Sequence, residues 1–186
     1  MLIALRLLLV MTTLTGIAYP ALVTIAAQAL FPFGANGSLQ LRNGQPYGSA
    51  LLAREVDRRR SFWPRPSACA YDPSLSGGSN AAPTSLALAE SIRSRTQAFI
   101  EWNDLPPGTS VPAEMLTTSG SGLDPDISPR AAFLQVGRVA TARGLPRALV
   151  ERLVAEHAEA PIWGLWGEPR VNVQRLNAAL ESAPDE

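Results

Sequence analysis

The chain has 186 residues, 46% of them apolar, and its sixteen basic and sixteen acidic side chains give a formal net charge of zero. Every basic residue is an arginine, which excludes Schiff-base chemistry, a lysine base and the lysine of a phosphate-binding P-loop. The interspersed charges give no electrostatic footprint for nucleic acid, and the length suits one domain with an appendage.

An apolar run without any charged side chain occupies residues 7–33, between Arg6 and the next charge at Arg42. At ~1.5 Å per residue, the run is long enough to cross a hydrocarbon core of ~30 Å. We therefore predict a single-pass protein of the inner (plasma) membrane, with its short leading end in the cytoplasm. Residues 1–33 then form the anchor, and residues 34–186 form one extracytoplasmic (periplasmic) domain.

A secretory signal peptide is the alternative interpretation of this run, with residues 27–29 (Ala-Gln-Ala) as the cleavage site. The run is longer than the usual ~7–15 residue apolar region of such a peptide. Its length therefore favours an uncleaved anchor.

Small residues recur at every fourth position within the anchor, at Thr12, Gly16, Pro20 and Thr24. This spacing predicts a narrow, grooved face that packs on another helix. Small residues are also common in membrane helices in general, so the stripe is a hypothesis about partner docking.

Three kinds of structure are predicted between the anchor and residue 83. An alternating strand near Ser38–Arg42 and a tight turn at Asn43 and Gly44 indicate a β-hairpin. Residues 49–60 have apolar side chains at helical spacing, which predicts a short amphipathic helix ending in three arginines. Residues 62–83 contain four prolines and three aromatic residues, which indicates an irregular loop docked onto the domain.

Four helices are predicted in the rest of the chain, and with the short strands they give a helix-rich α+β domain. They cover residues 85–102, residues 129–143 between a cap at Ser128 and a stop at Gly144, a helix from Pro146 that ends before Pro161, and a last helix capped by Asn172 after a short extended piece. Their expected buried faces are Leu88, Ile92, Phe99 and the stem of Arg95; Phe133, Val136 and Ala140; Leu149, Val150, Leu153 and Val154; and Leu176 with Leu180.

Two glycine-rich stretches are expected to have a conformationally restricted backbone and side chains too small to cover it. We name Ser76–Asn80 the first glycine loop and Ser119–Ser128 the second glycine loop. One interpretation is a pair of rigid connectors, and the other is a surface of backbone N–H and C=O groups that holds a partner. Under the second hypothesis the partner-docking residues are Thr12, Gly16 and Thr24 in the anchor, Ser76, Gly77, Gly78, Ser79 and Asn80 in the first loop, Ser119, Gly120, Ser121, Gly122 and Asp124 in the second, and Arg170.

Arg170 stands between Pro169 and Val171 and is the predicted charged anchor for a partner. The alternative is a structural ion pair with Glu168 or Asp124.

Few residues suit catalysis or metal binding. Asp124 and Asp126 would need loop carbonyls and waters to complete a cation site, and such pairs are more often turn formers. A single cysteine, Cys69, and a single histidine, His157, cannot build a Cys/His zinc site. We expect no catalytic residue, no metal and no nucleic acid. The alternative function is a membrane-anchored periplasmic hydrolase that uses Cys69 or a serine.

Several short motifs occur in one fixed order along the chain. They are RPSA (65–68), SGGSN (76–80), PT (83–84), TSGSGLDPDISP (118–129), RVATARGL (138–145), and GEPRVNV (167–173) followed by LN (176–177). In this order they resemble the C subunit of the Kdp high-affinity potassium-transporting P-type ATPase. The similarity extends from the membrane segment to Leu180. The chain departs from the family's usual pattern at Ala53, Arg54, Ser61, Phe62, Ala82 and Asp126, and no role is carried over to those positions.

The resemblance implies a complex in which a channel-like A subunit carries potassium, a B subunit hydrolyses ATP and a small F subunit assists. This chain would be its non-catalytic accessory subunit with one membrane span. The family is also credited with acting as a catalytic chaperone that raises the ATP affinity of the B subunit. ATP is thus implied through that subunit, since a domain outside the membrane cannot meet cytoplasmic ATP.

Overall fold

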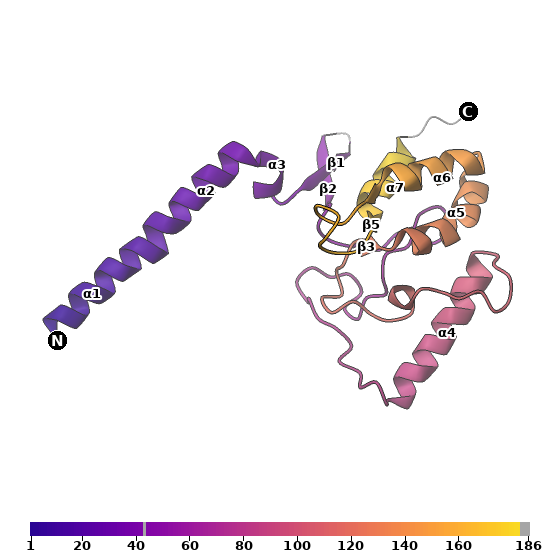
Figure 1. Cartoon of the computed structure of the whole chain (residues 1–186), viewed down its shortest axis with the longest axis horizontal. Helices are drawn as coiled ribbons and strands as arrows, with labels where there is room; N and C mark the ends of the chain where they lie inside the picture. The colour runs from indigo at the N-terminus through magenta and orange to yellow at the C-terminus, as the bar shows by residue number, and fades with distance from the viewer. Residues whose placement is uncertain (43, 183–186) are drawn as a thin grey trace. The chain divides into compact units, whose positions relative to one another are not determined.

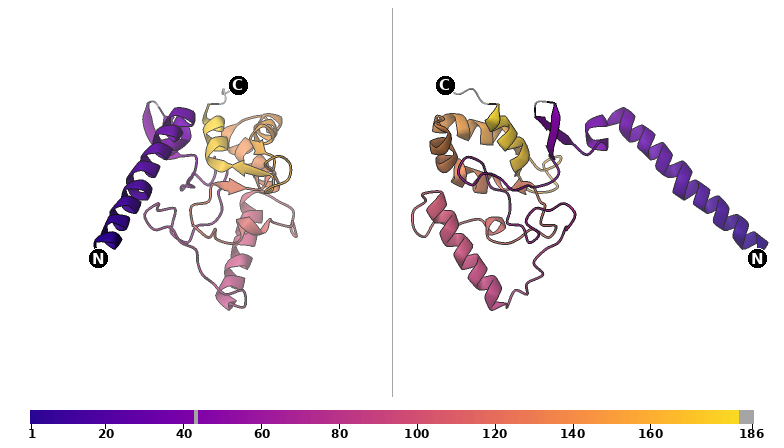
Figure 2. Two further views of the ribbon diagram at one scale, coloured as in Figure 1. Left: turned by 60° about the vertical axis from the view of Figure 1, so that its left-hand side comes forward. Right: turned by 180° about the vertical axis from the view of Figure 1, so that it is seen from behind.

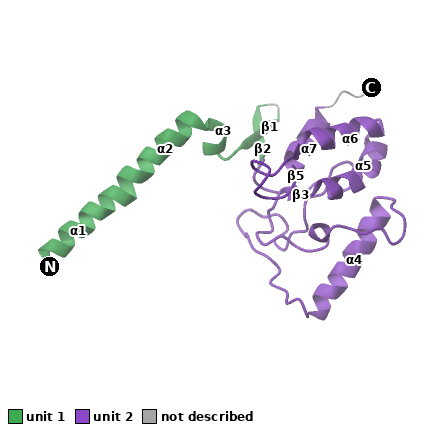
Figure 3. Ribbon diagram, in the orientation of Figure 1, with its two compact units in different colours: residues 1–49 green, residues 50–186 purple. Residues whose placement is uncertain are grey.

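The computed structural model describes residues 1–42 and 44–182 (Figure 1, Figure 2). It has two compact units, Met1–Ser49 and Ala50–Glu186 (Figure 3). The first contains a long helix and a hairpin, and the second contains further helices with a small sheet. The predicted α+β class with one N-terminal apolar helix is confirmed.

The long helix of the first unit is continuous but not uniform. It runs through α1 (Leu2–Thr13), a π-helical turn (Leu14–Ala18) and α2 (Tyr19–Leu30). Its 29 residues are apolar enough, with a mean hydropathy of 1.8, to cross a membrane. The π turn lies just before Pro20, whose ring nitrogen cannot donate a hydrogen bond to the carbonyl of Gly16.

The predicted β-hairpin is confirmed. A short helix, α3 (Pro32–Ala35), leads into the antiparallel strands β1 (Leu39–Arg42) and β2 (Gln45–Ser49). Gly44 has φ +77°, a left-handed conformation that glycine adopts without a steric penalty. Asn43, the other predicted turn residue, lies outside the described residues.

The helix predicted over residues 49–60 is wrong, because this segment is a series of turns. The carboxylate of Asp57 accepts a hydrogen bond from the backbone N–H of Arg59 (2.8 Å) and so forms a turn instead of a helix. The buried Ala53 donates its N–H to the carbonyl of Leu123 (2.8 Å). Ala50 and Ala53 of this irregular segment are therefore buried, while Leu51 and Leu52 are exposed. The irregular course predicted for residues 62–83 is confirmed.

All four helices predicted for the second unit are present in the described residues, with a three-stranded antiparallel sheet. The helices are α4 (Leu86–Trp102), α5 (Pro129–Arg143), α6 (Arg147–Glu156) and α7 (Val173–Glu181), and a 3-10 turn covers Ala113–Met115. The strands β3 (Asp126–Ile127), β4 (Ala158–Glu159) and β5 (Arg170–Asn172) lie in the order β3-β5-β4. Side chains of Ser85, Ser128 and Asn172 each accept a hydrogen bond from the first turn of the helix that follows.

The core lies between α5, α6, α7 and the sheet. Its buried members are Phe62, Phe99, Met115, Ile127, Ala131, Ala132, Val136, Val139, Ala140, Leu145, Val150, Val154, Val171, Val173, Leu176 and Leu180. The faces predicted for α6 and α7 are therefore confirmed, with Leu149 and Leu153 packed at the edge. By contrast, α4 buries only Phe99 of its predicted face, near its C-terminal end, and Leu88, Ile92 and Arg95 are half-buried. Leu86 at the other end of the helix is 82% exposed.

The predicted buried face of α5 is partly wrong. Val136 and Ala140 are buried as expected, but Phe133 is 42% exposed. Gln135 is fully buried in its place, because its side chain serves the backbone of Trp63.

The backbone of residues 62 and 63 forms its hydrogen bonds with two buried amide side chains instead of with a partner strand. Asn177 accepts from the N–H of Phe62 (2.8 Å) and donates to its carbonyl (3.0 Å). Gln135 accepts from the N–H of Trp63 (2.7 Å). An unpaired polar group at these depths costs about 1–3 kcal/mol, so these bonds hold the loop to the core.

We predict that Asn177→Ala lowers the free energy of unfolding by about 3 kcal/mol, because it leaves both backbone groups of Phe62 unpaired in the core. Denaturant unfolding of the full chain in detergent, followed by circular dichroism, measures this loss. The control is Gln97→Ala on the exposed face of α4, which should change stability by no more than about 0.5 kcal/mol. Equal losses in the two variants would contradict the role of Asn177.

Candidate functional site

The two glycine loops, which are about forty residues apart in the sequence, lie against each other. The N–H of Gly77 donates to the carbonyl of Ser121 (2.8 Å), and the hydroxyl of Ser76 donates to the same carbonyl (3.1 Å). The hydroxyl of Thr118 donates to that of Ser79 (3.1 Å). These bonds join the loops into one surface, which we name the paired-loop surface.

Glycine is required where the loops touch. Gly122 has φ +71°, and a Cβ there would lie 2.5 Å from the sulfur of Cys69 and 2.8 Å from the carbonyl oxygen of Gly77. A Cβ on Gly78 would lie 3.1 Å from the carbonyl oxygen of Gly120. Any side chain at Gly122 would push the loops apart.

A third segment, residues 66–71, contacts the two glycine loops and supports the paired-loop surface. The N–H of Ser119 donates to the carbonyl of Pro66 (3.1 Å). The hydroxyl of Ser67 accepts from the N–H groups of Cys69 (3.1 Å) and Tyr71 (3.0 Å) and so closes a turn beside Gly122. The loops are thus fixed to the segment that follows the half-buried Trp63.

The predicted docking residues of the loops divide into two sets. Ser119 and Gly122 are buried and act inside the structure. The exposed members are Ser76, Ser79, Asn80, Gly120 and Ser121, with Gly77, Gly78 and Asp124 half-buried. Next to them lies a hollow of about 500 Å³ between Leu51, Leu52, Leu123 and Pro125. Only the exposed and half-buried set is available to a partner.

The two aspartates of the second loop have structural partners. Asp124 accepts from the backbone N–H of Asp126 (3.0 Å), which is a turn-forming bond, and pairs with Arg65 (3.0 Å). Asp126 accepts from the amide of Asn172 (3.1 Å). Burial raises the pKa of the Asp126 carboxyl, and the nearby Arg170 guanidinium opposes that rise. In the described part of the chain, no three His, Cys, Asp or Glu residues gather as metal ligands.

Arg170 belongs to an ion-pair network, although not with the predicted partners Glu168 and Asp124. It pairs with Glu159 (3.0 Å) and Asp126 (3.4 Å), and Glu159 also binds Arg175 (2.9 Å). The alternative pairing with Glu168 or Asp124 is therefore wrong in its partners, because β5 places Arg170 beside β4 and β3. Its side chain is 54% exposed, so a role toward a partner stays a prediction.

Cys69 and His157 make separate sets of contacts. The sulfur of Cys69 lies 3.3 Å from the hydroxyl of Ser67 and 3.7 Å from the carbonyl of Gly122. His157 ends α6, with Nδ1 2.9 Å from the carbonyl of Leu153. No hydrogen bond joins the two side chains in the described residues, so the structure does not bring them together as a nucleophile and base.

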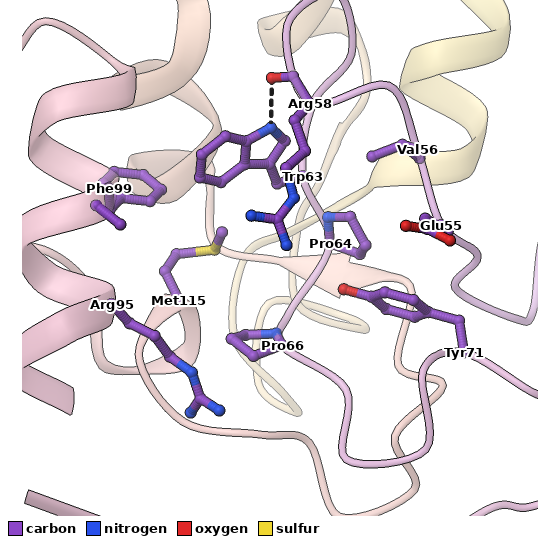
Figure 4. A pocket seen from close by; sticks show the side chains of 11 residues that line it. Glu55, Val56, Arg58, Trp63, Pro64, Pro66, Tyr71, Arg95, Phe99 and Met115 are labelled. Atoms are coloured by element: carbon purple, nitrogen blue, oxygen red, sulfur yellow. Dashed lines mark hydrogen bonds between the residues drawn. The ribbon is translucent and has the colours of Figure 1, made fainter. Parts of the chain in front are cut away.

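A separate pocket of about 160 Å³ opens beside α4 (Figure 4). Tyr71 borders it and donates its hydroxyl to the carbonyl of Arg65 (3.0 Å). Burial raises the pKa of this phenol, so it is neutral at physiological pH. The sequence indicated that the aromatic residues here dock, but the pocket itself was missed because its walls come from distant segments. They are Glu55, Val56, Arg58, Trp63, Pro64, Pro66, Tyr71, Arg95, Ala98, Phe99 and Met115.

The predicted docking residues of the anchor lie in the first unit. Thr12, Gly16 and Thr24 are exposed on the long helix. A Cβ on Gly16 would lie 3.8 Å from the methyl of Thr12, so these two residues are neighbours on one face. The π turn begins between them.

Comparison with known proteins identifies the family. The family described as "K+-transporting ATPase, c chain" (KdpC) matches residues 1–182. A potassium-transporting ATPase KdpC subunit of Variovorax paradoxus (strain S110) is 49% identical over 183 residues, which cover 97% of this chain and 94% of the relative. A KdpC subunit of Sorangium cellulosum (strain So ce56) is 51% identical over 183 residues, which cover 97% and 96%. The chain belongs to the KdpC family.

This KdpC chain is therefore a subunit of a potassium-transporting ATPase complex, and the resemblance found in its motifs is confirmed. The same motifs supply the paired-loop surface: SGGSN forms the first glycine loop, and TSGSGLDPDISP spans the second.

For this KdpC chain we predict that Gly122→Ala lowers the free energy of unfolding by about 1–3 kcal/mol, because the new Cβ clashes with backbone at Gly77 and φ is positive. The control is Gly120→Ala, where nothing lies within 4 Å of the added Cβ, and it should be near neutral. Thermal unfolding of both variants measures the difference in stability, and equal stability would contradict the tight fit at Gly122. Gly122→Val is thus unsuited to a docking test, because it disturbs the loops themselves.

Proposed function

We propose that this chain is a non-enzymatic accessory subunit of its potassium-transporting complex, anchored by Leu2–Leu30 and attached to a partner through the paired-loop surface. The anchor has the length and apolar character of a membrane span. In this proposal the second unit lies outside the cytoplasm, and its docking target is the external mouth of the channel-like A subunit.

The observation that carries the proposal is the locked contact between the two glycine loops. Their backbone is held by the Gly77–Ser121 bond and by the tight fit at Gly122. A surface already fixed in its bound shape loses little conformational entropy on docking, which favours affinity. Small exposed side chains such as Ser121 leave its backbone groups accessible to a partner.

The alternative of an anchored hydrolase gains no support from the geometry. Cys69 is packed against Ser67 and backbone carbonyls, and none of these groups is a general base. Tyr71, in the pocket beside α4, has a raised pKa and is a poor base at neutral pH.

The chaperone role implied by the family then acts through the membrane. A subunit that raises the ATP affinity of the B subunit has to bind more tightly to the complex when ATP is bound, because such coupling is reciprocal. In this proposal the A subunit transmits the effect, and the F subunit completes the membrane part. The chain itself needs no ATP site.

We predict that Gly120→Gln reduces co-purification of the full chain with a tagged A subunit about tenfold, because the added side chain projects from the paired-loop surface. Ala142→Gln, on the exposed side of α5, is the matched control and should leave assembly unchanged. The ATP concentration for half-maximal hydrolysis should rise in preparations that lack the subunit. Full retention of Gly120→Gln would refute docking through this surface.

We also predict the orientation. Protease added to right-side-out spheroplasts should digest the second unit, because its fourteen arginines can be reached by trypsin only from its own side of the membrane. Inverted vesicles should protect it. Protection in spheroplasts together with digestion in inverted vesicles would reverse the topology and make direct contact with ATP possible.

A further inference from the structure

The second unit exposes a cluster of large apolar side chains that the paired-loop surface does not include. It lies in the connection between β4 and β5, residues 161–167, which we name the aromatic loop (Figure 2). Trp163 is 82% exposed, Leu165 79%, Trp166 62% and Ile162 60%.

Hydrogen bonds and ring contacts within the aromatic loop keep its apolar side chains exposed to solvent. The N–H of Ile162 donates to the carbonyl of Trp166 (2.8 Å), and the N–H of Trp166 donates back (3.1 Å). The two indole rings meet edge to face with centroids 5.6 Å apart. Trp163 has φ +54°, a conformation that a bulky residue rarely adopts. The loop is therefore a closed turn that presents its rings.

Charge is confined to the base of the aromatic loop. No charged residue lies between Glu159 and Glu168. At the base, Glu159 pairs with Arg170 (3.0 Å) and Arg175 (2.9 Å). Neither indole N–H has a hydrogen-bond acceptor among the described residues. The loop thus combines an apolar tip, free indole donors and a charged base.

Elsewhere in the described part of the second unit, large exposed apolar residues occur singly or in pairs, as at Leu75 and Leu86. Isolated residues of that kind are ordinary on soluble surfaces, whereas four within one turn are not. A stable protein interface buries more than ~1,000 Å², which a turn of this size cannot supply alone. Insertion into a lipid–water interface needs no such area. It suits tryptophan, whose ring is apolar and whose N–H is polar.

We propose that the aromatic loop inserts into the lipid–water interface of the membrane that holds the anchor. The proposal rests on the anchoring of Leu2–Leu30, and it is independent of the paired-loop surface. Residues 31–49 connect the anchor to the second unit, and a chain extends at most ~3.3–3.6 Å per residue, so this tether keeps the domain within reach of that membrane. Contact through the loop would give the domain a second attachment and limit its rotation about the tether.

The test uses the intrinsic fluorescence of the full chain. All four tryptophans lie in the second unit, at Trp63, Trp102, Trp163 and Trp166. The chain is reconstituted into phosphatidylcholine vesicles whose acyl chains are brominated, because bromine quenches only nearby indoles. We expect quenching that is retained in Trp102→Phe and lost in the double variant Trp163→Phe, Trp166→Phe.

A second variant keeps both reporters. Leu165→Asp places a charge at the tip and should abolish most of the quenching, while Leu86→Asp, at a similarly exposed site in the first turn of α4, should not. Quenching that survives Leu165→Asp, or a blue shift of these tryptophans that appears only when partner subunits are added, would overturn the proposal. The latter result would mark the loop as a protein contact.

The same samples separate this proposal from the proposed function. Failure of the wild-type chain to float with vesicles would overturn both the anchor and the loop insertion. Flotation without quenching would overturn the loop alone. Gly120→Gln, which tests the paired-loop surface, should leave quenching unchanged.

Discussion

The second unit depends on how it holds the buried Phe62 and the half-buried Trp63 without a partner strand. The amides of Asn177 and Gln135 take the place of that strand. Arg138 completes the arrangement: it donates to three carbonyls of the preceding turn and lies 4.6 Å from the centroid of the Trp63 ring. Burial lowers its pKa to about 10, so the guanidinium is still charged at neutral pH. The core tolerates this charge because the N–H groups have acceptors.

The paired-loop surface depends on this segment. The chain leaves Trp63 and within a few residues supplies the carbonyl of Pro66 to Ser119 and the side chain of Cys69 to the space beside Gly122. The loops are thus connected to the core through direct contacts that restrict their movement. Their rigidity comes from the packing beneath them, and the glycines allow that packing to be close.

The helix caps could be predicted from the sequence, whereas contacts between distant segments could not, and the local apolar spacing of residues 49–60 was misleading. Capping depends on residues within one turn, so Ser128 and Asn172 could be placed from the sequence. The burial of Gln135 could not be predicted, because it results from a hydrogen bond with the backbone N–H of Trp63, seventy-two residues away. The meeting of the two glycine loops and the partners of Arg170 are set in the same way by tertiary contacts. The motifs identified the family, but the shape of the candidate site required the structure.

The π turn at Leu14–Ala18 affects how the anchor presents its small residues. In a regular α-helix a step of four residues overshoots a full turn by about 40°, so a stripe at that spacing winds around the helix. A π turn contains more residues per turn and removes part of that overshoot. Thr12 and Thr24 therefore lie closer to the same face of the helix than they would in a uniform α-helix. Restoring a regular α-helix at Leu14–Ala18 without deleting a residue would therefore rotate Thr24 away from the face that carries Thr12, with no change in the hydrophobicity of the anchor.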